Sequence, residues 1–119
     1  METVTIGADC YRLTATERDG AWSAHAERAD GSRFGIEWTG ATERDAIARL
    51  ARWLEWQHEH AAALEALQQA ERAYHRTIAG SAFASAVEGV SAIEMQKESL
   101  DAVEAARVSL DDVRARRPE

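Results

Sequence analysis

The sequence predicts an α+β fold: an antiparallel three- to four-stranded meander packed on a long helix, followed by a returning helix that forms an antiparallel helical hairpin. Residues 3–41 alternate between apolar and polar side chains with the two-residue period of strands. Residues 42–79 and 91–115 instead repeat apolar residues at helical spacing. The 119 residues leave room for one modest core, so residues 1–119 are predicted to form a single domain.

The predicted meander has one apolar face and one polar face. Asp19-Gly20 and Asp30-Gly31 separate three alternating runs, and such pairs are strong hairpin signals. Val4 and Ile6 form either a fourth strand or the start of the first one, bent at Gly7. The residues expected on the apolar face are Tyr11, Leu13, Ala15, Trp22, Ala24, Ala26, Phe34, Ile36 and Trp38.

The long helix is predicted over residues 42–79. Thr42 is a suitable N-cap, no proline interrupts the pattern, and Gly80 stands where a C-terminal cap is expected. Its first turns, with Ile47, Leu50, Trp53 and Leu54, are expected to cover the sheet. A helix of this length measures roughly 55 Å, whereas short strands cover only about 20 Å. Half of the helix therefore needs cover from elsewhere.

A short helix is predicted over residues 81–88 and a second long helix over residues 91–115. Ser91 and Glu94 have the spacing of a capping box, and Val90 with Met95 that of a hydrophobic staple. The two long helices are expected to pair antiparallel, with Ile78 opposite Ile93 and Ala61 opposite Leu110. This alignment sets Arg72 and Arg76 near Glu94 and Glu98, and Arg107 near Glu65.

Composition excludes several classes of function. The net charge of −7 argues against a nucleic-acid partner, because such surfaces are normally basic. No apolar run approaches the roughly 20 residues of a membrane span, and residues 1–3 do not resemble a signal peptide. Cys10 is the single cysteine, which favours a reducing compartment. We expect a cytoplasmic protein with neither membrane nor nucleic-acid partners.

Support for catalysis is weak. Glu55 and His58 have the Glu-x-x-His spacing of di-iron bundle sites, but those sites need a second such motif and further glutamates. Cys10 has no histidine near it in sequence, and a nucleophile needs a base within reach. The sequence therefore predicts no catalytic residue, no metal and no cofactor. A metal-dependent enzyme built on Glu55 and His58 remains the least favoured alternative.

The four tryptophans allow two interpretations. Trp22 and Trp38 share the strand face, and Trp53 and Trp56 lie three residues apart on the helix. They form either the core of a small domain or a surface that binds something. A small-ligand-binding domain, with an aromatic pocket between sheet and first helix, is accordingly the second functional hypothesis.

The order of three strands and a helix, with Gly40-Ala41-Thr42-Glu43-Arg44-Asp45-Ala46 leading into the helix, resembles HicB-like antitoxin domains. The resemblance covers roughly residues 3–57. The Pro-Gly segment common between the later strands of that family is absent here, as is its frequent C-terminal DNA-binding element. The resemblance implies a small partner-binding domain that does not bind DNA.

The favoured hypothesis is a non-enzymatic protein-interaction module that self-associates through its helical hairpin. Two helices cannot hide all the apolar residues of this hairpin, and two hairpins would form a four-helix bundle. The partner is a protein, either a second copy or another chain, and a homodimer is expected. The predicted interface residues are Trp56, Leu64, Leu67, Tyr74, Leu100, Val103, Val108 and Val113.

Overall fold

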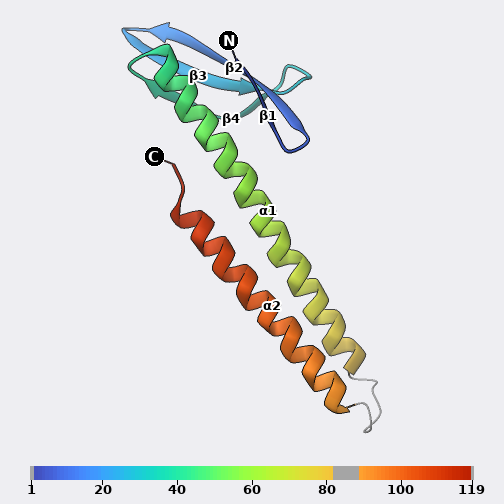
Figure 1. Ribbon diagram of the computed structural model, residues 1–119. Helices are drawn as coiled ribbons and strands as arrows, with labels where there is room; N and C mark the ends of the chain where they lie inside the picture. Colours follow the sequence, from blue (N-terminus) through green and yellow to red (C-terminus); the bar gives the residue numbers. More distant parts are fainter. Residues whose placement is uncertain (1, 82–88, 119) are drawn as a thin grey trace. The chain divides into compact units, whose positions relative to one another are not determined.

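The computed structural model describes residues 2–81 and 89–118. It contains a four-stranded antiparallel sheet, a long helix packed on the sheet and a second helix packed against the first (Figure 1). The predicted α+β fold is confirmed. The elements in chain order are β1 (Glu2–Ile6), β2 (Asp9–Arg18), β3 (Ala21–Glu27), β4 (Arg33–Gly40), α1 (Glu43–Ser81) and α2 (Gly89–Ala115).

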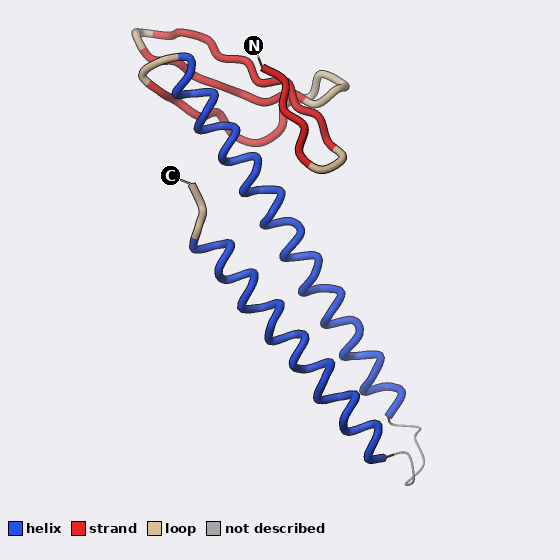
Figure 2. The backbone as a smooth tube through the Cα atoms, in the orientation of Figure 1, coloured by secondary structure: helices blue, strands red, loops and turns tan. Residues whose placement is uncertain are grey.

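The four strands lie in the order β1-β2-β3-β4, so each pairs with its neighbour in sequence (Figure 2). β1 is a separate strand, paired with β2 from Glu2 opposite Leu13 to Ile6 opposite Asp9. The β2–β3 turn is Asp19-Gly20, whose φ angles of 56° and 81° match the left-handed conformation that this turn class requires. The hairpin signal in the sequence therefore marked this connection correctly.

Contacts divide the chain into two compact units. The first comprises Met1–His58 with Arg117–Glu119, and the second comprises Glu59–Arg116. The first unit has a continuous core between the sheet and the start of α1, in which Leu13, Leu50 and Leu54 are almost completely buried. The other buried members are Tyr11, Ala24, Ala26, Ala46, Ile47 and Trp53.

Helix α1 begins as predicted. The Thr42 hydroxyl oxygen accepts a hydrogen bond from the backbone N–H of Asp45 at 3.1 Å, which is the expected N-cap contact. The helix continues through Gly80 to Ser81, so Gly80 does not end it. The helix extends past Gly80 because one glycine in a helix costs only about 1 kcal/mol.

The predicted apolar face of β4 is wrong at Ile36, which is 56% exposed. The pairing of β3 with β4 shifts between Ala24 opposite Trp38 and Ala26 opposite Phe34. Gly35, with a φ of 79°, lies in this irregular stretch. A Cβ added there would lie 2.4 Å from Cζ3 of Trp53, so the indole occupies the space that a side chain would need. The irregularity breaks the two-residue alternation and turns Ile36 to solvent.

In the second unit, α2 begins at Gly89 rather than at Ser91. Ser91 therefore lies inside the helix and not at its N-cap position. The predicted short helix over residues 81–88 lies outside the described residues, apart from Ser81, which belongs to α1.

The predicted alignment of the two helices is also wrong, by about one turn. Glu59 contacts Arg116, with 3.4 Å between Oε2 and Nη1, whereas the predicted alignment sets it opposite Asp112. Thr77 contacts Ser99 instead of lying opposite Glu94. A slide of one turn, 3.6 residues, leaves the same stripe of each helix facing its partner, so the apolar pattern does not separate these alignments.

The charge pairs expected between the helices do not form among the described residues. Arg72 and Arg76 each lie two residues from Tyr74, about 200° around the helix from that half-buried position. Both arginines are exposed, as are Glu94 and Glu98. These charges occupy the outer faces of the hairpin, where they do not meet across it.

Candidate functional site

The candidate site is the surface of the helical hairpin, residues 59–81 and 89–116. We call the line along which the two helices meet the seam. On α2 the seam residues recur at alternating spacings of three and four, as in a coiled coil. Val103 (3% exposed), Leu110 (3%) and Val113 are buried there. The half-buried members are Gln96, Ser99 and Ala106.

The facing stripe of α1 is covered less completely. Leu64, Leu67 and Tyr74 are half-buried, and no residue of α1 from Glu59 to Ala79 is buried. One helix of the hairpin thus contributes all of the buried residues that the structure describes in this unit, and the other contributes apolar side chains that keep part of their surface in water.

Polar contacts show how the two helices align. The hydroxyl oxygens of Thr77 and Ser99 lie 3.1 Å apart, and Arg114 Nε lies 3.5 Å from His60 Nε2. Thr77 and Ser99 were not among the residues predicted from the sequence to lie in the interface. Their positions could have identified them, because each is a polar residue on the side of its helix that faces the other helix.

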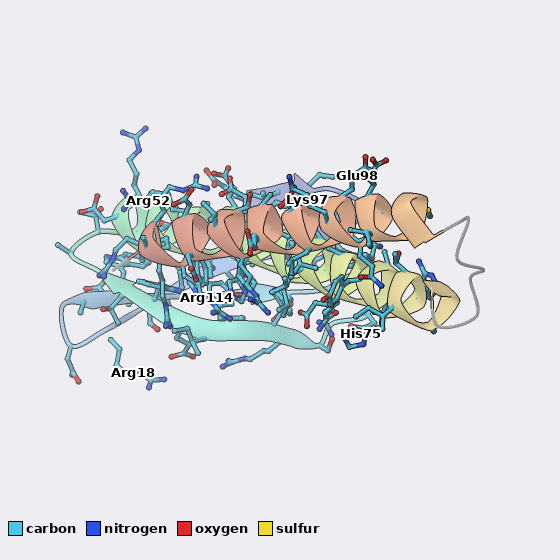
Figure 3. All side chains as sticks on the ribbon, turned by 90° about the horizontal axis from the view of Figure 1, so that it is seen from below. Arg18, Arg52, His75, Lys97, Glu98 and Arg114 are labelled. Carbon is cyan, nitrogen blue, oxygen red and sulfur yellow. The ribbon has the colours of Figure 1, made fainter. Side chains whose placement is uncertain are left out.

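The predicted interface residues differ in their exposure and in the unit to which they belong. Leu100 is 39% exposed and lies three residues before Val103, beside the seam. Val108 is 61% exposed and lies two residues from both Ala106 and Leu110, on the outer face of α2. Lys97 and Glu98 also extend from α2 to the side away from α1 (Figure 3). Trp56 belongs to the first unit, where the Arg117 guanidinium lies 5.7 Å from its ring centre.

The Glu-x-x-His motif of α1 is not assembled with other ligands in the part of the chain that the structure describes. The His58 ring lies against Gly7, where an added Cβ would be 2.6 Å from Cε1, so this histidine packs on the β1–β2 turn. Glu55 is exposed. Across residues 2–81 and 89–118, no three His, Cys, Asp or Glu side chains lie close enough together to hold a metal ion. That no metal binds remains a prediction.

A polar cluster lies on the sheet face opposite the core. Ser23 donates to Glu37 at 3.1 Å and Arg33 donates to the same carboxylate at 3.0 Å, while His25 contacts Glu27 at 3.1 Å. The hydrogen bond from Ser23 and the interaction with Arg33 lower the pKa of Glu37. Because the Ser23 hydroxyl is held by a carboxylate and not by His25, the cluster lacks the nucleophile–base contact that acyl transfer needs.

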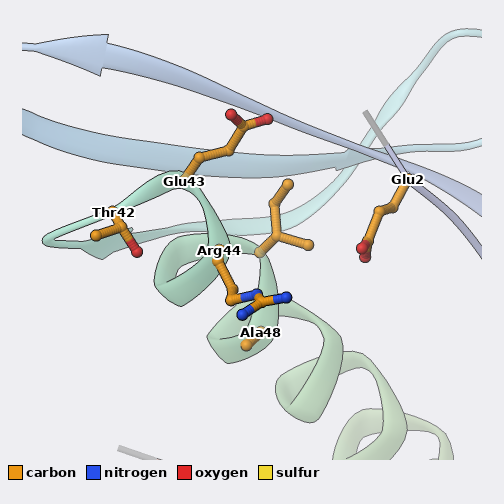
Figure 4. A pocket seen from close by; sticks show the side chains of 6 residues that line it. Glu2, Thr42, Glu43, Arg44 and Ala48 are labelled. Carbon is orange, nitrogen blue, oxygen red and sulfur yellow. The ribbon is translucent and has the colours of Figure 1, made fainter.

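The tryptophans of the first unit pack against protein. Trp53 contacts Phe34, with ring centres 6.0 Å apart, and the Arg49 guanidinium lies 5.1 Å from the Trp38 ring centre. A surface depression of about 560 Å³ lies beside the start of α1, and its lining is mixed polar and apolar, with no aromatic side chain (Figure 4). Glu2, Thr42, Glu43, Arg44, Ile47 and Ala48 line it. The aromatic ligand pocket therefore remains a prediction.

Comparisons with known proteins find no matching family model, no matching curated protein and no matching solved structure. Within the described residues, neither helix is long and apolar enough to cross a membrane.

Proposed function

We propose that the chain is a non-enzymatic protein-interaction module that forms a homodimer through its helical hairpin. The observation that carries this proposal is the uneven burial of the two helices. Residues 59–79 of α1 present Leu64, Leu67 and Tyr74 half-exposed, while α2 supplies every buried residue described in this unit. Apolar surface left in water favours association by about 25 cal/mol for each Å² that a partner covers.

The partly exposed leucines indicate which side of the hairpin the second copy covers. Leu64 precedes Leu67 by three residues, and Leu100 precedes Val103 by three. In two antiparallel right-handed helices, equal steps in the same sequence direction move to the same side of the seam. Leu64 and Leu100 therefore lie on the same side of the seam, roughly 18 Å apart along the hairpin. Two hairpins joined on that side form a four-helix bundle with two-fold symmetry.

Two further considerations support an interaction module inside the cell. The resemblance of residues 3–57 to HicB-like antitoxin domains favours the same class of function, a small partner-binding domain. Cys10 is exposed and free, which fits a reducing, cytoplasmic location.

The test compares two substitutions on the same helix, Leu100→Asp beside the seam and Val108→Asp on the outer face. Light scattering on a sizing column at micromolar concentration should give about 26 kDa for wild type, twice the chain mass of 13.1 kDa. Leu100→Asp should lower the mass to that of one chain, and Val108→Asp should leave it unchanged. Circular dichroism checks that both variants remain helical. A wild-type mass of one chain, or equal effects of the two substitutions, contradicts the proposal.

A further inference from the structure

The two edges of the sheet differ in how they are protected against pairing with another strand. An edge strand exposes unpaired N–H and C=O groups, and proteins blunt such edges with bulges, charged side chains and prolines. β1 and β4 are the edge strands of this sheet.

β4 is a protected edge. Its pairing with β3 is irregular around Gly35, which bends the strand, and its exposed side carries the ion pair of Arg33 with Glu37. Arg49 Nη1 donates to the carbonyl oxygen of Thr39 at 2.7 Å, so a side chain already satisfies a backbone acceptor near the end of this strand.

β1 has neither a bulge nor a proline, and its one charged side chain is Glu2, at the start of the strand. Five consecutive residues, Glu2 to Ile6, pair with β2 without a bulge, and the strand contains no proline, lysine or arginine. Among the described residues, β1 makes hydrogen bonds to β2 alone. Its second row of backbone groups is open, and the side chains of Thr3 and Thr5 are exposed.

We propose that β1 is a second self-association site, at which the β1 strands of two copies pair antiparallel and join two sheets into one. The strand sequence is self-complementary about Val4. In this two-fold arrangement Val4 faces its own copy, and Thr3 of each chain faces Thr5 of the other. Threonine pairs of this kind are favourable across strands.

Charge placement selects the antiparallel direction. Glu2 is the single charged residue of β1. Pairing about Val4 places it opposite Ile6, so the two glutamates lie at opposite ends of the new strand pair. Parallel pairing in register would instead set Glu2 against Glu2, and like charges directly opposite each other are destabilising. A second copy therefore fits this edge in one direction.

The experiment uses the full chain carrying Leu100→Asp as the parent, so that the hairpin does not contribute to self-association. It compares two double substitutions on β1 in this parent. Thr3→Lys with Thr5→Lys sets lysine against lysine across the two-fold axis. Thr3→Lys with Thr5→Glu sets lysine against glutamate at the same positions. Thr16→Lys, at an exposed position of β2 beyond the residues that pair with β1, is the control for an added charge. Mass by light scattering and amide hydrogen exchange of residues 2–6 are measured at micromolar and near-millimolar concentrations.

The parent chain and the lysine–glutamate variant should reach about 26 kDa at the higher concentration, twice the 13.1 kDa of one chain, with slowed exchange in β1. The lysine–lysine variant should stay at the mass of one chain with fast exchange, and Thr16→Lys should behave like the parent. Exchange in β1 that does not change with concentration or with the lysine–lysine substitution overturns the proposal. Equal disruption by both double substitutions overturns it as well. The hairpin dimer of the proposed function is tested separately. If that dimer does not form, Leu100→Asp alone leaves the mass of the otherwise wild-type chain unchanged.

Discussion

The two units bury apolar surface to different extents although they share one helix. Between Glu43 and His58, α1 contributes five residues to a core with the sheet, Ala46, Ile47, Leu50, Trp53 and Leu54. From Glu59 to Ala79 the same helix contributes no buried residue. A sheet presents a continuous surface that covers a wide face of a helix, whereas a single partner helix covers one stripe. The apolar side chains of α1 in the second unit therefore keep part of their surface in water.

The largest expected difference between the units comes from removing equivalent leucines. Leu50 and Leu110 are both buried helix residues, one in each unit. Leu50→Ala should lower the free energy of unfolding by about 4 kcal/mol, and Leu110→Ala by about 2 kcal/mol, because Leu→Ala costs depend on how much surrounding structure encloses the cavity.

The four tryptophans make this comparison measurable, since all of them lie in the first unit. Urea unfolding followed by tryptophan fluorescence reports that unit, and far-ultraviolet circular dichroism reports both helices. Leu50→Ala should shift both transitions, whereas Leu110→Ala should shift the dichroism transition more than the fluorescence transition. Equal free-energy losses for the two variants would show that the hairpin encloses its leucine as tightly as the sheet core does.

A smaller effect is expected from Gly35→Ala, which tests how the first unit fits Trp53 against β4. The new Cβ meets the indole at 2.4 Å and the residue must keep a φ of 79°, so both a clash and backbone strain oppose the change. We expect a loss of about 3 kcal/mol, at the upper end for strained positions.

Gly31→Ala is the matched control for this substitution. Gly31 also has a positive φ, of 87°, but nothing lies within 4 Å of an added Cβ. It should cost about 1 kcal/mol from strain alone. The same urea midpoints measure both variants, and similar losses would mean that the Trp53 contact does not determine the need for glycine at position 35.

The smallest expected effect is the alkaline titration of Tyr11 in the first unit. Burial, followed by the charge of Asp9, raises the pKa of Tyr11 above 10.0, while Arg28 acts in the opposite direction. A group whose pKa is raised on folding contributes stability that is fully present below its unfolded pKa and is lost as the pH rises through its folded pKa.

Wild type should therefore lose more stability above pH 10.0 than Tyr11→Phe does, whereas the difference between the two proteins should stay constant below that pH. Urea midpoints at neutral and alkaline pH measure this, and the absorbance of the phenolate follows the titration. A difference that does not change with pH would show that the phenolate is tolerated in the core.

The sequence was most informative where a local contact or a local conformation determines the structure. Asp19-Gly20 adopts the positive φ angles of its predicted turn, and Thr42 caps α1 through Asp45. Leu50 and Leu54 face the sheet because helical periodicity alone places them on one stripe. These features depend on neighbours within a few residues, so the sequence carries them directly.

The candidate site was predicted only in part. Leu64, Leu67 and Tyr74 do lie together along α1, whereas Val108 lies on the outer face and Trp56 in the other unit. The apolar stripe could place a residue to within one turn, but a slide of one turn preserves the stripe. Two contacts distinguish the observed alignment from the predicted one, Thr77 with Ser99 and Glu59 with Arg116. Both join residues far apart in sequence.

What the sequence determined by itself was three of the four strands, the Asp19-Gly20 turn and the two long helices, whereas it left open whether Val4 and Ile6 form a strand of their own. Those depend on the period of apolar residues and on local turn chemistry. Tertiary structure alone decided that Ile36 faces solvent and how the two helices align. Ile36 turns outward because the irregular pairing at Gly35 makes room for Trp53, whose indole comes from another element. The period of a strand or helix carries no information about the size and position of the side chain that meets it from across the fold.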